Sequence, residues 1–171
     1  MDFENPELAW FISVWDDVRG DRTMPVRADL TARVLKQNLA KLMLFERIQG
    51  EERHFYRVRL MATGLTQIWG DITGKLIDEA LPERLLPRWY GFLDLIILHR
   101  GPLRFVSRVD YQGKDFLVAE IGGAPIADET GNPTMVMAAI DTSGERSWEA
   151  VMDKYDGVKP LKQRRALAAV K

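Results

Sequence analysis

Alternation of apolar and charged residues with a period of two limits the fold of this chain more than any other feature. It is clearest at residues 54–61, where three apolar residues alternate with two arginines: Tyr56, Arg57, Val58, Arg59 and Leu60. Such alternation predicts a β-strand with one buried face and one solvated face. An apolar run at residues 42–48 precedes it across a turn that contains Gly50, so the two runs predict a hairpin.

Three further runs with strand character follow a long helical region, at residues 103–112, 114–122 and 134–141. The segment between the last two runs, residues 123–133, is rich in turn-forming residues. Two strands, a helical crossing and three strands predict an α+β fold, with a five-stranded antiparallel sheet and the helices of this core on one face. Domains of this kind leave a cavity between sheet and helices.

Two glycines, Gly70 and Gly74, interrupt the helical crossing. Residues 63–69 predict a short helix, which Gly70 can end in a left-handed conformation. Gly74 permits a second positive φ. A short helix and loop then follow at residues 75–87, and a longer apolar helix at residues 88–100. We therefore expect both glycines to serve the backbone conformation, which lets the short helices fold over the sheet.

Helical segments also flank the predicted sheet. Asn5 and Pro6 suit the N-cap and the first helical position, and the helix that follows would end near Gly20. Its apolar stripe consists of Leu8, Phe11, Ile12 and Trp15. A C-terminal helix would follow Thr142 with a second stripe: Trp148, Val151, Met152 and Tyr155. The chain therefore divides into an N-terminal helical extension at residues 1–40, a core domain at residues 41–143, and a C-terminal helix with a basic tail at residues 144–171.

Composition excludes several classes of function. The chain has no cysteine, which rules out disulfides, thiol catalysis and zinc–thiolate sites and favours a cytoplasmic location. Its net charge of −1 argues against strong binding to nucleic acid. The most apolar stretch, residues 89–98, is far shorter than the ~20 residues that span a bilayer, so we expect no membrane span.

Several short motifs occur in a defined order. Residues 59–63 read Arg-Leu-Met-Ala-Thr, similar to an Arg-Leu-x-Gly-Thr motif with Ala62 at the glycine position. Residues 70–74 are similar to Gly-x-Asp-Leu-Thr-Gly, one residue shorter. Matches to two further patterns, Pro-x-Arg-x-Asp and Asp-x-Thr, lie at Pro25, Arg27 and Asp29, and at Asp141 and Thr142. In this order the motifs resemble a PAS domain, and more narrowly the stand-alone PAS proteins of proteobacteria, from residue 42 to residue 142.

The resemblance implies a bacterial sensory domain in signal transduction, without catalytic activity, that acts through a downstream signalling protein. We expect it to bind a small, mainly apolar molecule between the sheet and residues 63–98. The candidate lining residues are Leu60, Ile68, Trp69, Leu95, Leu98, Phe105, Phe116 and Met137. PAS domains also favour dimers, so we expect a homodimer built on the two helical stripes. Packing of each stripe on its own sheet is the alternative.

No cofactor or metal is expected. Cysteinyl–flavin photochemistry needs a cysteine, which the chain lacks. Haem would need a histidine inside the long helix, whereas His99 stands at its end. Two other functions stay open: a small enzyme on a similar fold that uses Asp94 with His99 or His54 as acid and base, and a ligand-free interaction module with a filled core.

Overall fold

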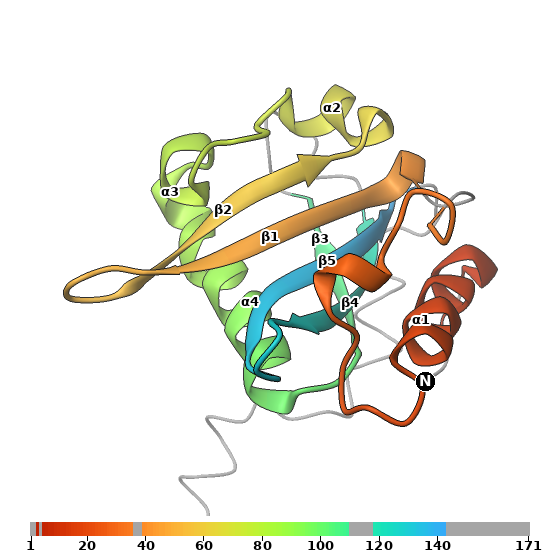
Figure 1. The fold of residues 1–171 in the computed structure, drawn as a ribbon. Helices are drawn as coiled ribbons and strands as arrows, with labels where there is room; N and C mark the ends of the chain where they lie inside the picture. Colours follow the sequence, from red (N-terminus) through yellow and green to blue (C-terminus); the bar gives the residue numbers. More distant parts are fainter. Residues whose placement is uncertain (1–2, 4, 36–38, 110–117, 143–171) are drawn as a thin grey trace, which may run out of the picture.

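The computed structural model describes residues 3, 5–35, 39–109 and 118–142. They form a five-stranded sheet in the order β2-β1-β5-β4-β3, and all neighbouring strands are antiparallel (Figure 1). The strands are β1 Leu42–Gln49, β2 His54–Met61, β3 Leu103–Arg108, β4 Val118–Ala127 and β5 Pro133–Asp141. The predicted α+β fold with this sheet is therefore confirmed. Strands β1 and β5 lie side by side in the middle of the sheet, and β2 and β3 form its two edges. The helical segment that connects β2 to β3 therefore crosses the whole sheet.

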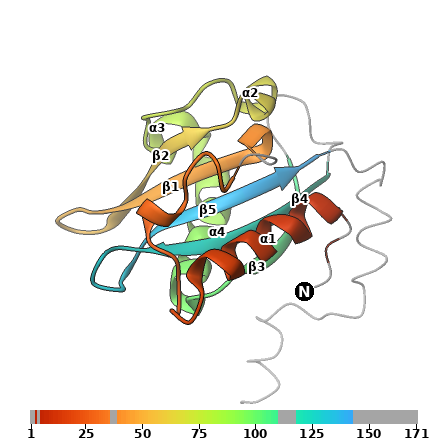
Figure 2. The same ribbon diagram turned by 45° about the vertical axis from the view of Figure 1, so that its right-hand side comes forward.

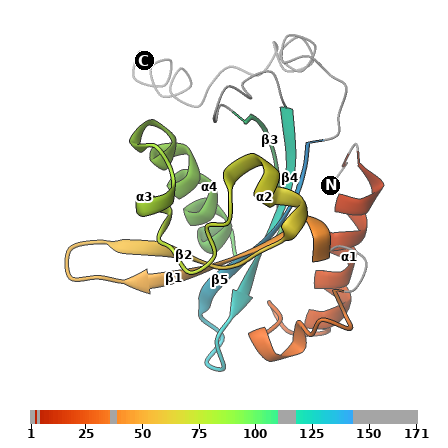
Figure 3. The ribbon, with the colours of Figure 1, turned by 90° about the horizontal axis from the view of Figure 1, so that it is seen from above.

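Helices cover both faces of the sheet (Figures 2 and 3). The α-helices are α1 Pro6–Arg19, α2 Thr63–Trp69, α3 Ile77–Ala80 and α4 Leu86–His99. Short 3-10 turns lie at Arg27–Asp29, Leu39–Lys41 and Glu83–Leu85. Helices α2, α3 and α4 pack on one face, as predicted for the core, while the N-terminal extension places α1 on the other face.

The sheet consequently separates two apolar cores. The inner core, between the sheet and α2–α4, includes the buried residues Phe45, Tyr56, Val58, Leu65, Ile77, Leu93, Ile96, Val136 and Ala138. The outer core, between the sheet and α1, includes Leu8, Phe11, Trp15, Leu42, Leu44, Ala124, Ile126, Met137 and Ala139. Burial of apolar surface on both faces explains why β4 and β5 show almost no polar alternation in the sequence.

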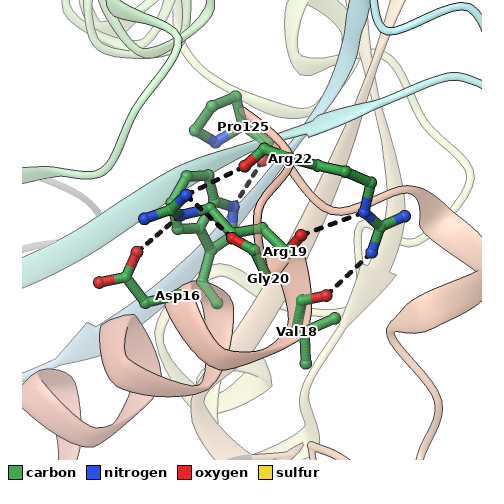
Figure 4. Close-up of polar contacts among 7 residues, drawn as sticks. Asp16, Val18, Arg19, Gly20, Arg22 and Pro125 are labelled. Atoms are coloured by element: carbon green, nitrogen blue, oxygen red, sulfur yellow. Dashed lines mark hydrogen bonds and ion pairs between the residues drawn. The ribbon is translucent and has the colours of Figure 1, made fainter.

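Polar groups secure both ends of α1. At its start, the Asn5 side chain accepts a hydrogen bond of 2.8 Å from the backbone N–H of Glu7, the N-cap that the sequence predicts. At its end, Arg22 donates to the carbonyl of Val18 at 2.9 Å, and Arg19 donates to the carbonyl of Gly20 at 3.1 Å (Figure 4). These arginines satisfy carbonyl groups near the end of the helix.

The apolar stripe of α1 lies against the sheet of its own chain. Leu8, Phe11 and Trp15 are at most 2% exposed, and Ile12 packs beside them. The Trp15 indole donates a hydrogen bond of 2.7 Å to the Pro125 carbonyl on β4. The intramolecular alternative therefore describes α1 in this structure, and the stripe is not available to a second chain. The predicted C-terminal helix and its stripe lie outside the described residues.

The two glycines after β2 have the backbone conformation that the sequence predicts. Gly70 has a φ of 72° and Gly74 a φ of 86°, and no neighbouring atom lies within 4 Å of a Cβ built on either one. The positive φ, and not contact with neighbouring atoms, therefore favours glycine at both positions. The turn is fastened to β2: Gly74 N–H donates to the Val58 carbonyl at 2.7 Å, and Val58 N–H donates to the Lys75 carbonyl at 2.9 Å. The segment therefore covers part of the outer edge of β2.

Strand β4 differs from its predicted bounds. The segment from Gly123 to Pro125, predicted to begin the turn-rich connection, lies within the strand. A glycine and a proline so close together resemble a turn in sequence, but each has a structural role here. Pro125 pairs with β5 beyond the last residue of β4 that pairs with β3, where a missing N–H disrupts no ladder bond.

The adjacent glycines of β4 let helices approach from both sides. A Cβ on Gly122 would lie 3.2 Å from the ring of Phe3 and 3.6 Å from that of Phe11 on the α1 side. A Cβ on Gly123 would overlap Ile96 Cδ1 and lie 2.9 Å from Phe92 Cζ on the α4 side. The strand therefore needs glycine at Gly123 for close packing, a requirement that the turn interpretation missed.

Candidate functional site

The candidate site is a cavity of about 310 Å³ between α4 and β3, closed at one end by α2. Its described lining is mostly apolar: Trp69, Pro87, Trp89, Gly91, Phe92, Phe105, Val106, Val109, Ala119 and Ile121, with Arg88, Ser107 and Arg108 as polar members. The predicted location, between the sheet and the helical crossing, agrees with this cavity.

Residues of α4 and β3 make up most of the described lining. On α4, Trp89 and Phe92 point inward at helical spacing together with the core residues Leu93 and Ile96. On β3, Phe105 belongs to the face that packs against the inner core. Side chains fill the space between α4 and β3 only in part, which leaves the cavity.

Gly91 is the unusual member of the lining. It lies in the interior of α4, where glycine costs about 1 kcal/mol relative to alanine. Its φ is not in the left-handed region, and a Cβ built on it would meet no atom within 4 Å. Neither conformation nor close packing explains the glycine. Gly91 is exposed at the rim of the cavity, on the same helix face as the exposed Leu95 and Leu98.

The predicted lining residues are distributed over several environments. Trp69 and Phe105 line the cavity, and Ile68 is buried in the inner core beside it. Leu60 and Met137 belong to the outer core, on the opposite face of the sheet. Leu95 and Leu98 lie on the solvent side of α4, 47% and 80% exposed. Phe116 lies outside the described residues.

Two structural features explain why Leu60 and Met137 lie in the outer core and not in the cavity lining. A β-bulge interrupts the pairing of β1 and β2, because Leu44 pairs with Leu60 whereas Phe45 pairs with Val58. The extra residue, Arg59, reverses the phase of alternation, so Leu60 turns to the outer core. Strand β5 is apolar on both faces, so alternation could not assign a face to Met137.

Most of the described lining was not among the predicted residues: Pro87, Arg88, Trp89, Gly91, Phe92, Val106, Ser107, Arg108, Val109, Ala119 and Ile121. A signal for Trp89 and Phe92 was present, because Trp89, Phe92, Leu93 and Ile96 have the i, i+3, i+4, i+7 spacing of a buried helix face. No comparable signal distinguishes Ile121 from its neighbours on β4, which is buried throughout.

A polar group ties α4 to the β1–β2 hairpin on the side away from the cavity. His54 Nε2 lies 2.7 Å from Asp94 Oδ1, and the Tyr56 hydroxyl donates to the same oxygen at 2.7 Å. Burial raises the pKa of Tyr56, and the hydrogen bond to Asp94 raises it further, so the phenol keeps its proton and acts as a donor. Asp94 therefore holds α4 against β2.

A second pair of contacts joins α4 to α3. The Tyr90 hydroxyl donates to Asp78 Oδ2 at 2.6 Å, and Arg53 forms an ion pair with the other oxygen of Asp78. Burial raises the pKa of Tyr90 to about 12, and the bond to Asp78 acts in the same direction. Burial would raise the pKa of Asp78, but the bonds from Tyr90 and Arg53 outweigh it and lower that pKa.

The residues of the enzyme hypothesis are brought together only in part. His54 and Asp94 are in contact, but neither lines the cavity. His99 is exposed at the last residue of α4 and does not line the cavity either. Within the described ranges, no group of three or more histidine, cysteine, aspartate or glutamate residues could hold a metal ion.

The described helices are also all too short or too polar to cross a lipid bilayer. The arrangement at the cavity offers apolar and aromatic surface, with few polar groups and no acid–base pair among its described residues. Such a site can bind and orient an apolar molecule.

A five-stranded antiparallel sheet with short helices and one long helix across one face is a PAS-like fold. A PAS domain from Bordetella pertussis BvgS is similar over 94% of this chain and 99% of its own, at 17% identity and a TM-score of 0.51. No family model matches the sequence, and no curated protein does.

Two further solved structures are more distant. A sensory box histidine kinase/response regulator from Burkholderia thailandensis is 15% identical, covers 82% of this chain and 100% of its own, and has a TM-score of 0.39. A LOV protein from Rhodobacter sphaeroides is 16% identical, covers 90% of this chain and 78% of its own, and has a TM-score of 0.42.

Proposed function

We propose that the protein is a non-catalytic sensory domain that binds a small, mainly apolar molecule in the cavity between α4 and β3. The observation that carries this proposal is the cavity itself. Its volume of about 310 Å³ lies at the lower end of the range for small-molecule sites. The cavity is partly open to solvent and its lining is mainly apolar, so a small apolar molecule could enter it and would be stabilised by burial of apolar surface.

The polar contacts of α4 connect the helix that lines the cavity to other elements of the domain. Trp89 and Phe92 face the cavity, while Tyr90 and Asp94 hold α3 and β2. A ligand that displaces α4 therefore also strains these bonds. We propose that the change reaches a downstream signalling protein in the bacterial cytoplasm, through a homodimer whose contacts exclude the buried stripe of α1.

Occupancy of the cavity can be tested with a cavity-filling variant, Ala119→Leu, and an exposed control, Gly91→Ala. The full chain is screened with small apolar compounds by thermal shift, and the purified protein is analysed by native mass spectrometry for a retained ligand. Ligands should raise the melting temperature of the wild type and of Gly91→Ala, because Gly91 is exposed. Ala119→Leu should fold, as checked by circular dichroism, and lose this response, because Ala119 is buried and lines the cavity.

If no compound raises the melting temperature of the wild type and no ligand is retained, the ligand-binding proposal fails and a ligand-free interaction module becomes the better description. Sedimentation at increasing protein concentration tests the homodimer separately. A strictly monomeric protein throughout would exclude it.

A further inference from the structure

The solvent side of α4 carries an apolar stripe. Leu95 is 47% exposed and Leu98 is 80% exposed, and within the described part of the chain they are the large apolar side chains left exposed. Gly91 and Pro87 are also exposed and lie one and two turns earlier on the same helix face. These four residues form the α4 stripe. Single apolar residues on a surface need no partner, but a continuous stripe indicates a surface that another apolar element covers.

Positive charge borders the α4 stripe. Three exposed arginines lie beside it or at its two ends: Arg84, Arg88 and Arg100. All three also interact within the protein, so the border acts through its net charge and not through vacant donors. Nearby, Glu83 is exposed and offsets one charge, while the Asp94 carboxylate is in contact with residues of β2. The border therefore favours an acidic partner over a basic one.

The C-terminal segment of the chain has the complementary sequence pattern. Residues 143–171 lie outside the described residues, and the first part of their sequence contains the predicted apolar stripe: Trp148, Val151, Met152 and Tyr155. Residues 143–156 have four acidic and two basic side chains, a net charge of −2: Glu145, Glu149, Asp153 and Asp156 against Arg146 and Lys154. An apolar stripe with acidic neighbours matches an apolar stripe with arginine neighbours.

The end of β5 brings this segment close to α4. Asp141, the last residue of β5, is paired with Glu120 on β4. The neighbouring residue on β4, Ala119, lines the cavity together with Arg88 and Gly91 of α4. Two strand spacings, about 10 Å, separate β5 from the edge strand β3 on this side. Seven residue steps lead from the end of β5 to the first tryptophan of the segment, and an extended chain spans at most about 25 Å over them.

The outer face of the sheet offers this segment no comparable surface. Helix α1 already covers β4 and β5 there, and its residues Leu8, Phe11 and Trp15 are buried against them. Among the described elements, the α4 stripe is the apolar helix face that is left exposed.

We propose that residues 143–156 dock on the α4 stripe of their own chain as an amphipathic helix. Burial of Leu95, Leu98 and the apolar stripe of the segment stabilises the contact, and the opposite charges favour this segment over the basic tail that follows it. The short connection raises the effective concentration of the segment to about the millimolar range, so a weak contact is sufficient. The inference does not depend on a bound ligand and goes beyond the proposed sensory function.

The absence of cysteine from the chain allows a direct test by disulfide cross-linking. Val151→Cys and Met152→Cys are each combined with Leu95→Cys, and cysteine keeps these positions apolar. Under mild oxidation, one or both pairs should form an intramolecular disulfide. The rate should be roughly tenfold higher than for the same segment cysteines combined with Ser13→Cys, on the exposed side of α1, because docking raises the local concentration at α4 alone.

Peptide mapping and non-reducing gels distinguish the products. Equal rates with the cysteines on α4 and on α1 would overturn the inference. A covalent dimer in place of the cross-linked monomer would mean that the segment binds the α4 stripe of a second copy, which would overturn docking within one chain.

Hydrogen exchange of the full chain without introduced cysteines provides an independent test. The amides of residues 146–156 should be protected in the wild type and should lose protection severalfold in Leu95→Asp/Leu98→Asp. Both leucines are exposed, so the amides of β1 and β5 should keep their protection and show that the core still folds. Ser13→Asp is the control and should change nothing in the segment. Unprotected amides in the wild-type segment, or protection that survives the double substitution, would overturn the inference.

Discussion

Alanine at Gly123 should test how closely α4 packs on the sheet. The added Cβ would overlap Ile96 Cδ1 and lie 2.9 Å from Phe92 Cζ, whereas ordinary contacts begin at 3.4 Å. Ile96 is fully buried, so its side chain has little room to move away. Overpacking of this kind costs about 1–3 kcal/mol. Alanine recovers about 0.5–1 kcal/mol through the unfolded state, so we expect a net loss of roughly 1–2 kcal/mol.

The matched control is Gly91→Ala, on the helix that Gly123 contacts. Its Cβ would meet no atom within 4 Å, so helix propensity alone should raise the free energy of unfolding by about 1 kcal/mol. Urea denaturation followed by far-UV circular dichroism measures both variants against the wild type. The two changes should have opposite signs. A Gly123→Ala variant as stable as the wild type would refute the close-packing argument.

Two further predictions concern the backbone and pH. Alanine at Gly70 or Gly74 should each lower the free energy of unfolding by about 1 kcal/mol, because both have a positive φ; unchanged urea midpoints would contradict this. The pKa of Asp78 is lower in the folded protein than in the unfolded chain, where it is about 3.9. The bonds of Asp78 to Arg53 and Tyr90 therefore stabilise the protein fully above the unfolded pKa. This stabilisation is lost as the pH falls through the folded pKa. The stability gap between wild type and Asp78→Asn should therefore narrow below pH ~4; a gap that is constant between neutral and acidic pH would exclude this role.

The overall topology could be predicted because local signals agreed along most of the chain. The hairpin, the cap of α1 at Asn5 and the turn at Gly70 each depend on residues close together in sequence. Strand β4 could not be predicted in full, because its glycines and Pro125 depend on tertiary structure. The glycines allow close packing of α1 and α4, and Pro125 lies beyond the last residue that pairs with β3. Those contacts join segments that are far apart in the chain.

The candidate site was less predictable than the fold for a related reason. Helix α4 is apolar on most of its surface, so the choice between Phe92 inward and Leu95 outward depends on where the sheet lies. For Leu60, a one-residue bulge in β2 reversed the predicted face. In both cases the residue type was right for a lining, and the direction was set by tertiary structure.

The neighbouring glycines of β4 also have a consequence for engineering. Gly122 is packed by α1 and Gly123 by α4, so consecutive residues of one strand support layers on opposite sides. Mutant libraries that vary residues around Phe92 should therefore also consider the residues that pack on the α1 side. Selections that vary both layers together should recover more folded variants than selections confined to the cavity wall, because effects at contacting residues do not add.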